Sequence, residues 1–78
     1  MPTIIAKNKV LFERDEIADF NDRWPCSLLD PRRHYWFEFD DIGCLVDTDV
    51  PEHQDGDAAK ALSDDAYDFL LTMNVKGA

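Results

Sequence analysis

The sequence predicts an α+β fold: a small antiparallel sheet with a central β-hairpin at about residues 34–49, and two helices packed on one face. Strand-favouring aromatic residues at 35–39 are followed by a turn and a second apolar run, which is the pattern of a hairpin. Two further segments, at about 15–24 and 57–73, repeat their apolar residues with the period of a helix. Since no long linker interrupts the chain, we expect residues 1–78 to form a single domain.

The predicted hairpin sorts its side chains onto two faces of the sheet. Gly43 lies in the turn between the strands, where a residue without a side chain takes a positive φ at no steric cost. Because successive strand residues point to opposite faces, one face should join the core and the other should meet solvent. The expected core face carries Tyr35, Phe37, Phe39, Cys44, Val46 and Thr48. The expected outer face carries His34, Trp36, Glu38, Leu45, Asp47 and Asp49.

Two short apolar runs, at residues 3–6 and 10–12, precede the first helix. Either both are strands of a small hairpin, or the second leads straight into the helix; so few residues leave both alternatives open. The apolar residues of the first helix are Ile17, Phe20 and Trp24. Pro25 ends this helix, because the residue before a proline is disfavoured in the α region. Residues 24–29 should then form an ordered, mostly buried connection.

The last helix has the clearest amphipathic pattern in the chain, after an N-cap at Asp55 or Asp57. Its apolar stripe consists of Ala58 or Ala59, Leu62, Ala66, Phe69 or Leu70, and Met73. Its opposite face carries Asp64, Asp65 and Asp68. Residues 74–78 are expected to fray.

Charge is distributed unevenly along the chain. The formal net charge is −9 and the isoelectric point is near 4.3. Acidic and basic residues cancel up to Phe37, so the whole acidic excess lies from Glu38 onward. This asymmetry argues against direct binding of nucleic acid or of an anionic membrane, both of which are polyanions, and favours a basic partner. With no apolar stretch of membrane-spanning length and no signal-peptide pattern, we expect a cytoplasmic protein.

Metal binding and catalysis receive little support from the residue spacing. Zinc sites usually bring ligands in close pairs, whereas Cys26, His34, Cys44 and His53 are eight to ten residues apart. Both cysteines are expected to be buried packing residues. The acidic segment from Asp47 departs from an EF-hand calcium loop because Pro51 occupies a ligand position. We therefore expect no enzymatic activity and no cofactor.

The arrangement of the acids is the best candidate for a functional surface. Alternate residues on one strand face are about 6.6–6.8 Å apart, and helix residues at i and i+4 about 6 Å apart. These intervals approximate the spacing of successive phosphates along a nucleic-acid strand. The predicted partner-binding residues are Trp36, Glu38, Asp47, Asp49, Glu52, Asp55, Asp57, Asp64, Asp65 and Asp68. They would mask a basic surface of a nucleic-acid-handling protein, with Trp36 as the apolar anchor.

Two other interpretations stay open. A small structural, dimerisation or antitoxin-like module would use an exposed apolar face, with the chain acting as a monomer or a homodimer. A divalent-metal-binding protein would be centred on residues 47–57.

The chain resembles the small acidic proteins carried by phages and other mobile elements, including anti-CRISPR proteins, several of which act as nucleic-acid mimics. The resemblance is one of type: size, the one-sided acidity of EFDDIGCLVDTDVPEHQDGD and ALSDDAYDF, and the lack of a catalytic motif. It implies a host nucleic-acid enzyme or a CRISPR effector complex as the target.

Overall fold

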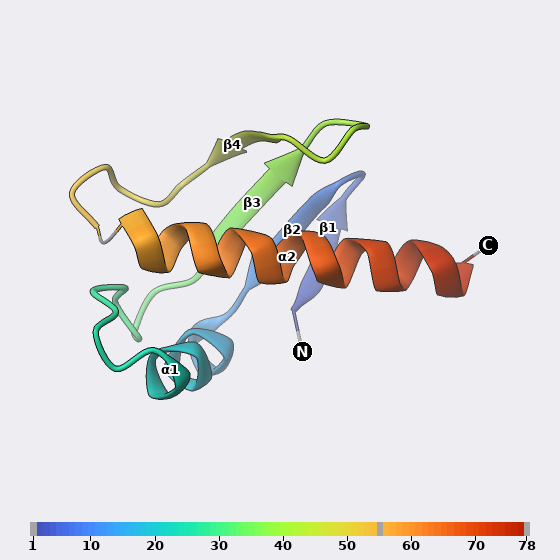
Figure 1. Cartoon of the computed structure of the whole chain (residues 1–78). Helices are drawn as coiled ribbons and strands as arrows, with labels where there is room; N and C mark the ends of the chain where they lie inside the picture. The colour runs from blue at the N-terminus through green and yellow to red at the C-terminus, as the bar shows by residue number, and fades with distance from the viewer. Residues whose placement is uncertain (1, 55, 78) are drawn as a thin grey trace.

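A four-stranded antiparallel sheet and two helices make up the computed structural model, which describes residues 2–54 and 56–77 (Figure 1). The strands lie in sequence order across the sheet, so β1 and β4 form its edges. The elements in chain order are β1 (Thr3–Ala6), β2 (Lys9–Phe12), α1 (Arg14–Arg23), β3 (Tyr35–Phe39), β4 (Leu45–Thr48) and α2 (Gly56–Gly77). The predicted α+β class with a central hairpin and two helices is confirmed.

The first two apolar runs are both strands. β1 and β2 pair antiparallel through a turn in which Asn8 takes a left-handed φ of 59°, a conformation that asparagine tolerates better than most residues. Glu13 alone then separates β2 from α1, so the end of the sheet leads almost directly into the helix.

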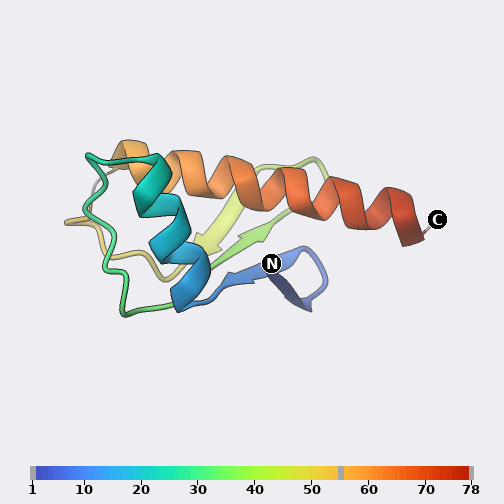
Figure 2. The same cartoon turned by 90° about the horizontal axis from the view of Figure 1, so that it is seen from below.

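The core lies between the inner face of the sheet and the two helices. Figure 2 shows α2 running along one side of the sheet with α1 across its end. The inner face supplies Val10, Phe12, Tyr35, Phe37 and Phe39, and the helices supply Ile17, Phe20, Ala58, Leu62, Ala66 and Leu70. The buried α2 residues recur at i+4, as the predicted stripe requires.

Three predictions near the helix ends need correction. α2 continues to Gly77, past the predicted end at residue 73, because no proline or glycine interrupts it before then. Met73 is 38% exposed, since this end of α2 extends beyond the sheet (Figure 1). The connection at residues 24–29 is mostly exposed, and only Leu29 in it is buried.

The predicted alternation of the second hairpin strand holds at Asp47 and Thr48 and is wrong for the residues before them. The β3–β4 register shifts between Glu38 and Phe39, so Phe39 pairs with Leu45. When one strand contains an extra residue, the side chains before that residue point to the opposite face of the sheet from the one that strict alternation predicts. Leu45 therefore lies on the inner side of the sheet, while Val46 and Cys44 are exposed.

Candidate protein-binding surface

The outer face of the sheet is covered by no helix of the described chain (Figure 2). The register places Lys9, Glu38 and Asp47 in one row across β2, β3 and β4, with Trp36 and Leu11 in the neighbouring row. Trp36, Glu38 and Asp47 thus share a face, as the alternation predicted. We call these three residues the open-face site.

Glu38 and Asp47 are direct cross-strand partners. Directly opposed residues in an antiparallel pair have Cα atoms about 4.5–5.5 Å apart, and like charges in this position destabilise a sheet. Neither carboxylate forms an ion pair with a described residue. Lys9, the nearest base in register, instead places its Nζ 4.0 Å from the centroid of the Trp36 ring. The open-face site therefore carries two carboxylates without an ion-pair partner among the described residues, beside an aromatic ring, and Asp47 Oδ1 accepts a hydrogen bond of 2.8 Å from the amide of Thr48.

Asp49 is tied to the backbone of the hairpin. Its Oδ1 accepts a hydrogen bond of 2.9 Å from the amide of Trp36, while Thr48 Oγ1 donates one of 2.7 Å to the Trp36 carbonyl. These bonds hold the start of β3 to the end of β4, so Asp49 has a structural role at this position. Glu52 is exposed in the following loop, and Asp55 lies outside the described residues.

The acids of α2 lie on the other side of the molecule, because this helix packs on the inner face of the sheet. Asp64 forms an ion pair of 3.5 Å with Lys60, and Asp65 forms one of 3.5 Å with Arg23. The remaining predicted acids on this helix, Asp57 and Asp68, are exposed. The ten predicted residues therefore do not form one continuous surface: those of the open-face site lie on the outer face of the sheet, and those of α2 lie on the helix that covers the inner face.

The structure contains two surface cavities that the sequence did not predict. A groove of about 450 Å³ runs between α2 and β4, with Phe37, Leu45 and Tyr67 among its lining residues. Leu45 reaches this groove only because of the register shift, which periodicity does not reveal. A second cavity is lined by Arg14, Arg32, Arg33, His34 and Asp49. The consecutive basic residues at 32–34 could have indicated this cavity from the sequence, but Arg14 lies beside them only in the folded chain.

The residues considered for metal binding and nucleophilic catalysis are dispersed. Cys26 and Cys44 are both exposed, which corrects their prediction as buried packing residues. Across residues 2–54 and 56–77, no three His, Cys, Asp or Glu side chains gather in a way that could hold a metal ion. The metal-binding alternative thus gains no support from the described part of residues 47–57.

The comparisons with known proteins add no relatives: no protein-family model, curated protein or solved structure matches the chain. Among the described helices, none is long and apolar enough to cross a membrane.

Proposed function

We propose that this protein is a non-enzymatic acidic binding protein whose open-face site covers a basic surface of a nucleic-acid-handling partner protein. The observation that carries the proposal is the direct opposition of Glu38 and Asp47 beside Trp36. Because like charges directly opposed on two strands repel each other, these two carboxylates are well placed to bind a cation from outside.

An arginine or lysine of the partner would relieve the repulsion between these two carboxylates. Burial under a partner would also lower the local dielectric constant and strengthen the attraction. Trp36, half-buried on the same face, offers a rigid aromatic surface of the type that dominates interface energetics. The net charge of −9 would speed the encounter through electrostatic steering. A CRISPR effector complex is one partner of this class.

The experiment is an affinity pull-down from a bacterial lysate at low and at several-fold higher salt, with bound proteins identified by mass spectrometry. The test variant carries Glu38→Gln and Asp47→Asn. A matched control carries Asp64→Asn and Asp68→Asn, which removes the same charge from the opposite side of the molecule. We expect a nucleic-acid-binding protein to be captured by the wild type and the control, released by salt or by added nucleic acid, and lost with the test variant. Capture that the control loses and the test variant keeps would contradict the open-face assignment.

A second candidate function is an interaction module that associates through apolar contacts. The observation that favours it is the edge strand β4, where Leu45 is 46% exposed and Val46 is 61% exposed. Such an edge presents unpaired backbone groups to another strand. This function predicts association that persists at high salt and a molecular mass that rises with concentration.

A further inference from the structure

Three arginines and a histidine line one surface cavity of about 230 Å³ in this strongly acidic protein. Arg14 is the first residue of α1. The segment that leads into β3 supplies Arg32, Arg33 and His34. Among the described lining residues, Asp49 is the one carboxylate. The lining of this cavity is therefore net positive, opposite in sign to the charge of the chain, although Glu13 and Asp15 line another cavity that shares Arg14 and His34 with it.

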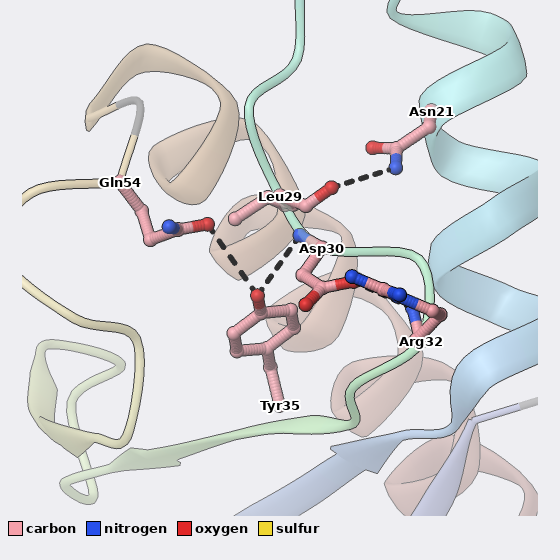
Figure 3. A network of polar contacts seen from close by, with 6 residues as sticks. All are labelled: Asn21, Leu29, Asp30, Arg32, Tyr35 and Gln54. Carbon is pink, nitrogen blue, oxygen red and sulfur yellow. Dashed lines mark hydrogen bonds and ion pairs between the residues drawn. The ribbon is translucent and has the colours of Figure 1, made fainter.

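Hydrogen bonds fix the turn that presents Arg32 (Figure 3) and, next to it, Arg33. Asp30 Oδ1 accepts a bond of 2.9 Å from the Arg32 amide, and the Asp30 carbonyl accepts one of 3.1 Å from the Arg33 amide. The Asp30 amide in turn donates to the hydroxyl of Tyr35, a fully buried side chain, at 3.0 Å. Two arginines thus leave the backbone from a turn anchored in the core.

Within the described residues, the arginines that line this cavity form one ion pair, between Arg32 and Asp30. Arg14 has no ion pair with a residue of 2–54 or 56–77, and the Arg33 guanidinium lies 5.6 Å from the centre of the Tyr35 ring. Arg32 has only a long contact of 3.5 Å between its Nε and Asp30, with its side chain 89% exposed. Asp49, the carboxylate in the lining of this cavity, already accepts a hydrogen bond from the amide of Trp36.

We propose that this cavity binds the phosphate group of a small phosphate monoester. The guanidinium group presents a planar fork of donors that matches phosphate oxygens, and several such groups are needed to balance a dianion. The volume of about 230 Å³ is several times the ~30 Å³ that a water molecule occupies in the liquid. A phosphate group with its bridging waters therefore fits. This inference is independent of the proposed function, because the open-face site attracts cations and this cavity attracts an anion.

The test is an NMR titration of the full chain with inorganic phosphate, at constant pH and with ionic strength held constant by sodium chloride. We expect saturable shifts of the backbone amides of residues 32–34. Arg33→Gln and Arg14→Gln, tested singly, should each weaken phosphate binding by roughly tenfold, the loss expected for one charge-assisted hydrogen-bonding group. Both side chains are exposed, so an unchanged melting temperature should show that the fold is intact.

The matched control is Arg23→Gln, which removes an exposed arginine that pairs with Asp65 on α2 and does not line this cavity. It should leave phosphate affinity unchanged. Shifts that never saturate, or an equal loss of affinity in Arg23→Gln, would overturn the proposal. Parallel titrations with a nucleoside monophosphate and a hexose phosphate identify the source of the ligand. Equal affinities would assign the phosphate group alone as the ligand, and tighter binding of one ester would assign its organic part to the site as well.

Discussion

The hydroxyl of Tyr35 accepts a hydrogen bond from the amide of Asp30 at 3.0 Å and donates one of 3.4 Å to Gln54 Oε1. Tyr35 begins β3 and is fully buried, so this hydroxyl joins the sheet to two loops that lie apart in sequence (Figure 3). One of these loops carries the arginines of the proposed phosphate site, and the other precedes α2.

Tyr35→Phe should therefore lower the free energy of unfolding by about 1–2 kcal/mol, because it leaves a part-buried amide without its acceptor. It should also weaken phosphate binding, since the turn loses its anchor. Urea unfolding and the phosphate titration measure the two effects. Tyr67→Phe is the matched control, because the Tyr67 hydroxyl has no hydrogen bond to a described residue. An equal effect of both substitutions would contradict the role given to the Tyr35 hydroxyl.

Gly43→Ala should destabilise the protein by about 1–3 kcal/mol, the usual cost of a strained backbone position. Gly43 has φ of +92°, and a Cβ atom there would lie 2.5 Å from the Cζ and Oη atoms of Tyr67. Gly56→Ala is the control, because no atom beyond its chain neighbours and the backbone of its own helix turn lies within 4 Å of the position of its Cβ. Comparing urea midpoints measures the difference, and a Gly43→Ala variant as stable as Gly56→Ala would contradict both the positive φ of Gly43 and its close approach to Tyr67.

Neutralising the open-face site should raise stability while it abolishes partner binding. In the Glu38→Gln, Asp47→Asn variant, removal of a directly opposed like-charge pair should add about 0.2–1 kcal/mol to the free energy of unfolding. This combination is typical of a functional site that is maintained at some expense of stability. Thermal and urea unfolding give the stability, and the pull-down gives the binding. A loss of stability would indicate that the two carboxylates have a structural role.

Acid should weaken the turn at Asp30. The hydrogen bond from the Arg32 amide and the charges of Arg32 and Arg33 lower the pKa of Asp30 from its ordinary value of 3.8. A carboxyl group whose pKa is lower in the folded state contributes stability above the unfolded pKa and loses it as the pH falls through the folded pKa. The contribution of Asp30 is therefore present at pH 7 and is lost below about pH 4.

The measurement is the urea midpoint of the wild type and of Asp30→Asn at a series of pH values. The wild type should be the more stable at pH 7, and the difference should shrink in acid. Asp41→Asn removes an exposed carboxylate that lies 3.9 Å from Lys7 and accepts a hydrogen bond of 3.3 Å from Asn8, and it controls for the loss of a negative charge at another turn. A difference between wild type and Asp30→Asn that stays constant with pH would contradict this account.

The sequence by itself determined the fold class and most of the core. Alternation of aromatic residues placed Tyr35, Phe37 and Phe39 inward, and 3.6-residue periodicity placed Leu62 and Ala66 against the sheet. These patterns are local consequences of strand and helix geometry, so they can be read without knowing what each face contacts. For the same reason, Trp36, Glu38 and Asp47 could be placed together on the outer face before the structure was known.

Only the tertiary structure decided which charges meet. The register shift after Glu38 moved Leu45 inward and left Cys44 exposed, because an extra residue reverses strand facing without altering composition. Packing of α2 on the inner face separated its aspartates from the open-face site, and folding brought Arg14 to Arg32 and Arg33. Such groupings depend on pairing and packing between distant segments, which periodicity along one segment does not record.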